Sequence, residues 1–306
     1  MTATAARGLV VAKAPVAGRV KTRLGRVIGM EQAAELAAAA LLFILALAKK
    51  LPAQERITRD HRWDLQAKVL GDEIQGRTLG IIGLGNTGRE LARLAHHVSA
   101  RLVHVSSEQV FAGELNRTYG VGDAPAPINL YGRQKVESER LVHSTAREFA
   151  VTLRAPLLMG NSLAGKRSTH ERLLADWAAG RPAKLYTDEY RQPCTAENLA
   201  EAMLELCERN DVRGVFHWGG TELVSRHDLG CRIRAHFKLS EREAPIISVS
   251  RAETPEAARR RHPCLALNLA PLAGTLKTRP QSIAEQLEGM NLPPPVRAWF
   301  HALGQP

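Results

Sequence analysis

The sequence lacks the features that mark zinc-binding, disulfide-rich or membrane-spanning proteins. Four cysteines occur in 306 residues and none forms a CxxC pair, so neither a metal site nor a disulfide framework is predicted. The longest apolar stretch, residues 33–48, is interrupted by Glu35 and ends at Lys49, which is unsuitable for a membrane span. The N-terminal apolar run is too short for a secretory signal. We therefore expect a protein of the reducing cytoplasm.

Acidic residues are also scarce, because 31 Asp and Glu stand against 42 Lys and Arg. Such an excess favours nucleic-acid binding when it is clustered and accompanied by a recognisable motif. The basic groups at residues 19–26 and 259–261 have no such motif, and aromatic residues make up only 5% of the chain. We favour a solvated surface, or attraction of an anionic small molecule such as a nucleotide sugar, over nucleic acid.

Apolar runs and helical patterns alternate along the chain. This alternation predicts an α/β fold, with a Rossmann-like parallel sheet and helices on both of its faces. Beyond Pro156 the pattern predicts a smaller C-terminal lobe at the carboxyl edge of the sheet. We therefore expect a dinucleotide-binding and catalytic core at residues 1–160 and a substrate-binding lobe at residues 161–306. The expected strands are residues 8–14, 78–84, 101–105, 151–154 and 214–218, and the expected helices are residues 30–50, 89–97, 131–150, 168–179, 195–208 and 225–238.

The strongest chemical pattern is VHVSSEQVFAG (103–113) followed by INLYGRQK (128–135). Tyr131 and Lys135 are four residues apart, so they share one face of a helix. An ammonium near a phenol favours the phenolate and lowers its pKa from about 10. We predict that Tyr131 is the acid/base, that Lys135 tunes its pKa and contacts the ribose, and that Ser107 polarises the substrate. A Tyr and a Lys at this spacing also occur on surface helices by chance.

The order of these residues resembles the dTDP-4-dehydrorhamnose reductase family of the extended short-chain dehydrogenases. The resemblance spans about residues 100–300 and includes VTLRAPLLMG (151–160) and DEYRQPCTAENLAEAML (188–204). It implies that Ser107, Tyr131 and Lys135 form a catalytic triad. It also implies reduction of a keto group on a nucleotide-linked sugar by NADPH or NADH, although some members of the family are regulatory subunits.

Glu108 and Arg191 are the predicted substrate-binding residues. Glu108 follows the strand that ends in Ser-Ser, where the family more often has Asp, and its alternative role is to hold the ribose of a dinucleotide. Arg191 lies in the segment that faces the cleft in the resembled family. A salt bridge at the surface is an equally good explanation of Arg191.

A glycine series at Gly83, Gly85 and Gly88 follows the apolar run TLGIIGL and predicts a dinucleotide pyrophosphate site. We expect these glycines, with Tyr131 and Lys135, to bind NADP or NAD. The surrounding residues 44–94 resemble the entry into the cofactor domain of the D-2-hydroxyacid dehydrogenases, without that family's catalytic regions.

Residues 8–42 resemble the start of a glycosyltransferase or nucleotidyltransferase-type family, in which Lys21 and Arg23 would contact phosphates. A structural role for this segment is the better interpretation. The three resemblances meet near residues 42 and 99, which indicates a mosaic up to about residue 98.

We predict an NAD(P)-dependent reductase of a nucleotide-linked keto sugar. The first alternative is an inactive sugar-nucleotide-binding or regulatory protein with a defective cofactor half, and the second is a nucleotide-sugar transferase. The expected partner is a small-molecule nucleotide sugar. We expect neither nucleic acid nor membrane, and a homodimer is left open.

Overall fold

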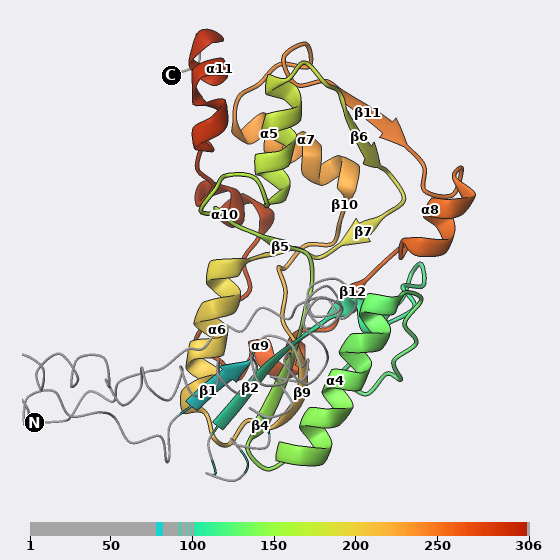
Figure 1. Ribbon diagram of the computed structural model, residues 1–306, viewed down its shortest axis with the longest axis vertical. Coiled ribbons are helices and arrows are strands. Elements are labelled where there is room, and N and C mark those ends of the chain that lie inside the picture. The colour runs from blue at the N-terminus through green and yellow to red at the C-terminus, as the bar shows by residue number, and fades with distance from the viewer. Residues whose placement is uncertain (1–77, 82–91, 93–95, 97–98, 100, 305–306) are drawn as a thin grey trace, which may run out of the picture. The chain divides into compact units, whose positions relative to one another are not determined.

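A computed structural model of the protein describes residues 78–81, 92, 96, 99 and 101–304 (Figure 1). Two compact units share this part of the chain, and each is described by itself. Unit 1 contains the described residues up to Ser106, Gln134–Leu153 and Leu206–Val215, and unit 2 contains Ser107–Arg133, Arg154–Glu205 and Phe216 onward. The expected division at residue 160 stays a prediction. The expected elements at residues 8–14 and 30–50 lie outside the described residues.

The main sheet has the strand order β1-β2-β4-β9. Strand β1 pairs with β2 in parallel, with Thr78 opposite Arg101. Every residue of β2 and β4 is buried, as in parallel sheets that are covered on both faces. The predicted α/β class and the strands expected near residues 78, 101, 151 and 214 are confirmed. The strands are β1 (Thr78–Ile81), β2 (Arg101–Ser107), β4 (Ala150–Ala155) and β9 (Gly214–His217).

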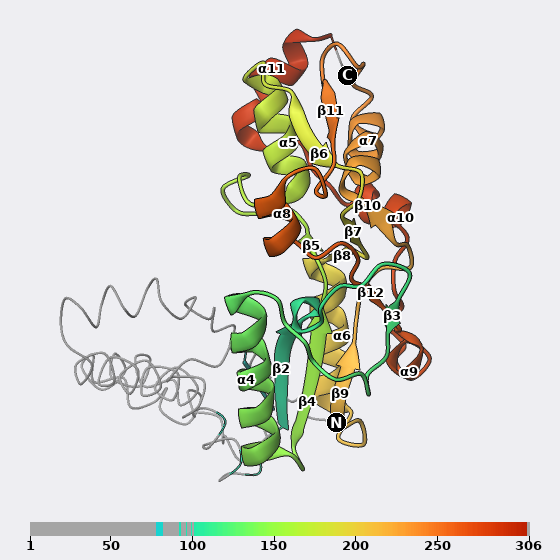
Figure 2. The same cartoon turned by 90° about the vertical axis from the view of Figure 1, so that its right-hand side faces the viewer.

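Buried polar side chains of β2 find their partners within unit 1. His104 Nε2 lies 3.1 Å from Ser138 Oγ, and Ser106 Oγ donates to Glu139 at 2.5 Å. Ser138 and Glu139 lie on helix α4 (Leu130–Ala146), which runs beside β2 (Figure 2). Because buried polar groups are costly without hydrogen bonds, these contacts fix the face that α4 turns to the sheet.

The core of unit 2 lies between helices and a two-stranded parallel sheet. Strands β6 (Ala183–Tyr186) and β11 (Ile246–Val249) pair in register, and helices α5 (Thr169–Ala178) and α7 (Arg226–His236) pack beside them (Figure 1). Trp177 is 2% exposed and its indole donates to Pro245 O at 3.1 Å. Helices α5 and α7 thus contribute apolar side chains to a core that also includes residues of β6, α10 (Ile283–Glu288) and α11 (Arg297–Ala302).

The remaining elements are short, except for one helix. Helix α6 (Ala196–Glu208) follows β8 directly. No helix in the described part of the chain is long and apolar enough to cross a membrane. The other elements are η2 (Glu108–Val110), β3 (Thr118–Tyr119), β5 (Leu158–Met159), β7 (Tyr190–Arg191), β8 (Cys194–Thr195), β10 (Val224–Ser225), α8 (Pro255–Arg260), β12 (Ala266–Leu267), α9 (Ala270–Ala273), α10 (Ile283–Glu288), η3 (Pro294–Val296) and α11 (Arg297–Ala302).

An aromatic and cationic cluster surrounds His217 within unit 2. Its ring meets the Phe111 ring edge-on, with centroids 5.5 Å apart, and the Arg154 guanidinium lies 4.9 Å from the Phe111 centroid. Burial, with the nearby Arg154 charge, lowers the pKa of His217 to about 4. His217 is therefore neutral in the folded protein at neutral pH.

This lowered pKa predicts a loss of stability in mild acid. The unfolded chain takes up a proton near pH 6.5, whereas the folded chain takes it up only near pH 4. The free energy of unfolding should therefore fall as the pH drops through this interval, by on the order of 2 kcal/mol for this residue. Urea unfolding of His217→Phe should show a shallower fall than the wild type. The exposed His301→Phe serves as the control, and parallel curves for His217→Phe and the wild type would contradict the prediction.

Candidate functional site

One pocket of about 800 Å³ lies within unit 2, and four of the eight site residues predicted from the sequence line it. Ser107, Tyr131, Glu108 and Arg191 all line it. Its wall is rich in charged side chains, which distinguishes it from the mostly apolar pockets that bind uncharged ligands. The other lining residues are Gln109, Pro156, Leu157, Leu158, Tyr186, Glu189, Arg226, Thr254, Glu256, Ala257, Arg260, Arg261 and His262.

The backbone on either side of Tyr190 gathers the charged residues of this wall. Strand β7 pairs antiparallel with β10, with Ser225 opposite Tyr190. On its other side Tyr190 N donates to Pro263 O at 2.7 Å, and Leu265 N donates to Tyr190 O at 3.3 Å. Three segments that are distant in sequence therefore run side by side. Their charged residues meet at Glu189, which precedes β7.

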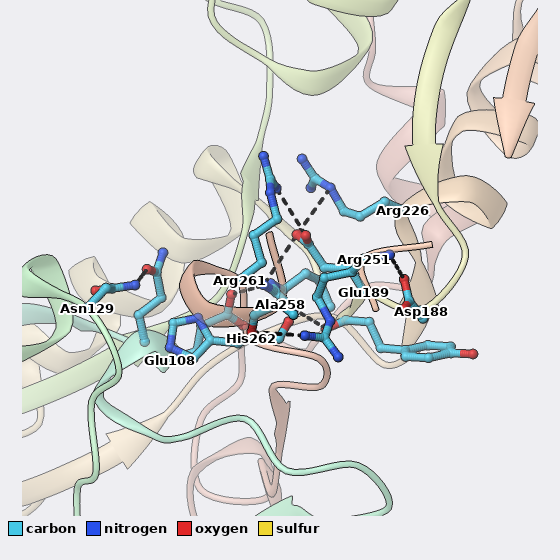
Figure 3. A network of polar contacts seen from close by, with 12 residues as sticks. Glu108, Asn129, Asp188, Glu189, Arg226, Arg251, Ala258, Arg261 and His262 are labelled. Carbon is cyan, nitrogen blue, oxygen red and sulfur yellow. Dashed lines mark hydrogen bonds and ion pairs between the residues drawn. The ribbon is translucent and has the colours of Figure 1, made fainter. Parts of the chain in front are cut away.

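Ser107 and Tyr131 come together at the start of α4. Their side chains form a hydrogen bond, and Ser107 Oγ also accepts from Gln109 N at 3.3 Å. Asn129 fixes the helix start, because its amide donates to Gln109 Oε1 at 2.9 Å and accepts from Gly132 N at 2.8 Å (Figure 3). This side-chain cap satisfies a backbone group that a helix N-terminus leaves unpaired.

The pKa of Tyr131 differs from the expected direction. Desolvation of the hydroxyl raises this pKa, and the hydrogen bond with Ser107 lowers it by less. We expected Lys135 to lower the pKa of Tyr131, but the shift comes from desolvation, from Ser107 and from the Glu108 charge, and not from Lys135. A raised pKa keeps the phenol protonated at neutral pH, which is the form that donates a proton to a carbonyl oxygen.

Lys135 lies one helical turn after Tyr131 on α4. Its ammonium donates to Val105 O at 2.8 Å, within unit 1. Burial lowers the pKa of Lys135 to about 8, and Glu139 acts in the opposite direction. Lys135 therefore remains mostly protonated at neutral pH, as its predicted contact with a ribose requires.

The two predicted substrate-binding residues contact each other. Arg191 Nε lies 3.4 Å from Glu108 Oε1, and both side chains are buried. Burial raises the pKa of Glu108 to about 8, although Arg191 and Arg226 act against this rise. The alternative prediction for Arg191 was a salt bridge at the surface. Arg191 does form ion-pair contacts, but they lie in the interior.

Glu189 is the centre of a charge network that sequence reasoning missed. Its carboxylate lies 3.3 Å from Arg191 Nη2, 3.0 Å from Arg261 Nη1 and 3.8 Å from Arg226 Nε (Figure 3). The basic run at residues 259–261 was a visible signal in the sequence, but it was interpreted only as bulk charge. Glu189 and Arg191 are two residues apart on one extended segment, which places them on the same face.

The predicted glycine turn cannot be placed relative to this pocket. Gly83, Gly85 and Gly88 lie outside the described residues, as do Lys21 and Arg23. In the described part of the chain, no group of three or more His, Cys, Asp or Glu residues is arranged to hold a metal ion.

Two family models match the chain, and they overlap. The model of the RmlD substrate binding domain matches residues 85–290. The model of the NAD binding domain of D-isomer specific 2-hydroxyacid dehydrogenases matches residues 41–119. These two resemblances derived from the sequence are thereby confirmed, while the junction expected near residue 99 stays a prediction.

Known relatives share about a third of the aligned residues. Methionine adenosyltransferase 2 subunit beta of Xenopus tropicalis is 32% identical over 173 residues, which is 54% of this chain and 51% of the relative. The probable low-salt glycan biosynthesis reductase Agl14 of Haloferax volcanii is 32% identical over 154 residues, which is 49% of this chain and 50% of the relative. The chain thus spans about half the length of these relatives.

Solved structures share the fold. A dTDP-4-dehydrorhamnose reductase from Bacillus anthracis in complex with NADP has a TM-score of 0.60 at 20% identity, covering 68% of this chain and 78% of that one. MoeE5 in complex with UDP-glucose and NAD has a TM-score of 0.55 at 17% identity, covering 69% and 78%. These similarities confirm the Rossmann-like fold.

The close approach of α4 to η2 gives a testable prediction at Gly132. A Cβ at this position would lie 2.1 Å from Gln109 O and 2.7 Å from Pro127 Cβ. Gly→Ala within a helix ordinarily stabilises by about 1 kcal/mol, whereas overpacking costs about 1–3 kcal/mol. Gly132→Ala should therefore destabilise the protein in urea unfolding by about 2 kcal/mol. Gly122→Ala, where nothing lies within 4 Å, is the control, and a stabilised Gly132→Ala would show that the approach is not tight.

Proposed function

Because the chain belongs to the RmlD substrate binding domain family, we propose that it is an NAD(P)-dependent reductase of a nucleotide-linked keto sugar. The observation that carries this proposal is the hydrogen bond between Ser107 and Tyr131 in the wall of a charged pocket. A pocket of about 800 Å³ is within the size range of sites that enclose small ligands. Its arginines suit the diphosphate of a nucleotide sugar.

The proposed chemistry divides between Tyr131 and Ser107. The protonated phenol of Tyr131 donates its proton to the keto oxygen, while the Ser107 hydroxyl donates a hydrogen bond to the same oxygen and stabilises the charge that develops there. NADPH or NADH, when bound, supplies the hydride to the carbon. Without the ligand, the hydrogen bond with Ser107 lowers the pKa of Tyr131. Because the Ser107 hydroxyl has a single proton, this donor turns to the keto oxygen when the ligand is bound.

The proposed cofactor site combines residues from the two segments of the chain that match different families. Lys135 and Tyr131 would contact the ribose, and the glycine series at Gly83, Gly85 and Gly88 would hold the pyrophosphate. A buried ammonium and a phenol on one helix face suit ribose hydroxyls, because they offer donors of fixed position. Support comes from the match of residues 41–119 to an NAD binding domain and from solved neighbours that contain NADP or NAD.

A second candidate function is binding or regulation without turnover. The relatives named methionine adenosyltransferase 2 subunit beta favour it, because their name describes a subunit of another enzyme. The pocket is also compatible with it, because the described residues that line the pocket all belong to unit 2. Such a protein would hold the nucleotide sugar without needing a competent cofactor half. A cytoplasmic location is proposed for either function.

The reductase proposal predicts that Tyr131→Phe loses most of its turnover. The variant lacks the proton donor, so turnover of a nucleotide-linked keto sugar, followed by nicotinamide absorbance, should fall at least about a hundredfold. Affinity for the cofactor should change little, because the ring still packs. Tyr190→Phe removes a hydroxyl that forms no hydrogen bond in the described part of the chain, and it serves as the matched control. Near-normal turnover by Tyr131→Phe would refute the assignment.

Lys135→Ala separates the two roles proposed for the lysine. We propose that the same ammonium contacts the ribose and tunes the pKa of Tyr131. The variant should therefore lose turnover and cofactor affinity together. Cofactor affinity is measured by equilibrium titration without substrate. Loss of turnover at unchanged affinity would remove the ribose role and leave the role at Tyr131.

A further inference from the structure

Arg191 has its donors committed to protein groups. Nη1 donates to Tyr190 O at 2.6 Å and to His262 O at 3.0 Å, Nη2 faces Glu189 at 3.3 Å, and Nε faces Glu108 at 3.4 Å. A guanidinium has five N–H donors, and four of those of Arg191 face these protein groups. Arg191 therefore joins strand β7 to the segment after α8, and little of its donor capacity is left for a ligand.

Arg226 differs from Arg191, although it lines the same pocket. It is the first residue of α7, and its side chain is 18% exposed. Its Nε lies 3.8 Å from Glu189 Oε1, and its two terminal nitrogens form no hydrogen bond with any described residue. Burial lowers the pKa of Arg226, with Glu189 acting against this shift. The two terminal nitrogens of this mostly buried guanidinium are therefore available to an anion in the pocket.

The charge balance around Glu189 is positive. One Glu189 carboxylate faces the guanidinium groups of Arg191, Arg226 and Arg261. Glu108 adds little negative charge at neutral pH, because burial raises its pKa to about 8. The inner wall of the pocket therefore carries a net positive charge, which suits the negatively charged diphosphate group of a nucleotide sugar.

Arg261 is less suited than Arg226 to supply the main contact. Its guanidinium stacks over the Tyr186 ring at 4.8 Å, and its side chain is 47% exposed. An exposed charge is screened by water, whereas a buried one interacts more strongly with an anion. Figure 3 shows that Arg226 and Arg261 both approach the carboxylate of Glu189.

We infer that Arg226 binds the diphosphate group of the ligand in this pocket, and that Arg191 instead holds the pocket wall together. The inference rests on the proposed function, which identifies the ligand as a nucleotide sugar. It assigns the ligand contact to a residue that the sequence pattern did not indicate.

The test uses the full chain and isothermal titration with inorganic pyrophosphate and, separately, thymidine diphosphate. Arg226→Gln, which keeps a donor but no charge, should weaken both affinities at least about tenfold, because a hydrogen bond to a charged group is lost. Arg226→Lys should lie between Arg226→Gln and the wild type, since it keeps the charge without the planar fork. Arg181→Gln removes an exposed arginine paired with Asp176, and it should stay within about twofold of the wild type. Thermal unfolding of each variant establishes that it is folded.

The outcomes distinguish a failure of the inference from a failure of the proposed function. Affinities of Arg226→Gln and Arg226→Lys within about twofold of the wild type overturn the inference, whether or not the protein is a reductase. Failure of the wild type to bind either probe overturns it as well. A tenfold loss in Arg226→Gln, together with no turnover of any nucleotide-linked keto sugar by the wild type, upholds the inference and refutes the reductase.

Discussion

The buried carboxylate of Glu189 is the interaction on which the pocket depends. It lies within 4 Å of three guanidinium groups that come from separate parts of the chain. Like charges at this spacing repel strongly in a buried environment, so the arginines can be gathered only around a counter-charge. Backbone pairing on both sides of Tyr190 brings the segments together. The backbone pairing thus brings the arginines together, and the negative charge of Glu189 offsets the repulsion between them.

The part of the pocket wall that holds Ser107 and Tyr131 depends on packing. Helix α4 begins against η2 so closely that only glycine fits at residue 132. Asn129 caps this helix start and is itself held by Gln109. As a result, the Tyr131 side chain reaches Ser107 at the end of β2. The hydroxyl pair is thus positioned by local contacts, whereas the charged wall is positioned by contacts that are distant in sequence.

This difference explains how much could be predicted from the sequence. Strand β2, helix α4 and the Ser107, Tyr131 and Lys135 pattern could be predicted, because periodicity and spacing are local. The role of Arg191 could not, because its partner His262 is 71 residues away. The pKa of Tyr131 was expected to fall with Lys135 nearby, but desolvation depends on the whole surrounding fold and raises it. Arg226 carried no motif, and only the register of β7 with β10 places it beside Glu189.

The central claim is that the chain reduces its ligand with a nicotinamide cofactor and is not a binding protein alone. The most direct test is a titration of the full chain with NADPH and, separately, NADH, followed by nicotinamide fluorescence. We expect a saturable change in fluorescence for at least one of them, and displacement of that reduced form by its oxidised counterpart. No change with either cofactor, in protein that still binds thymidine diphosphate, would contradict the reductase and leave the binding protein as the better explanation.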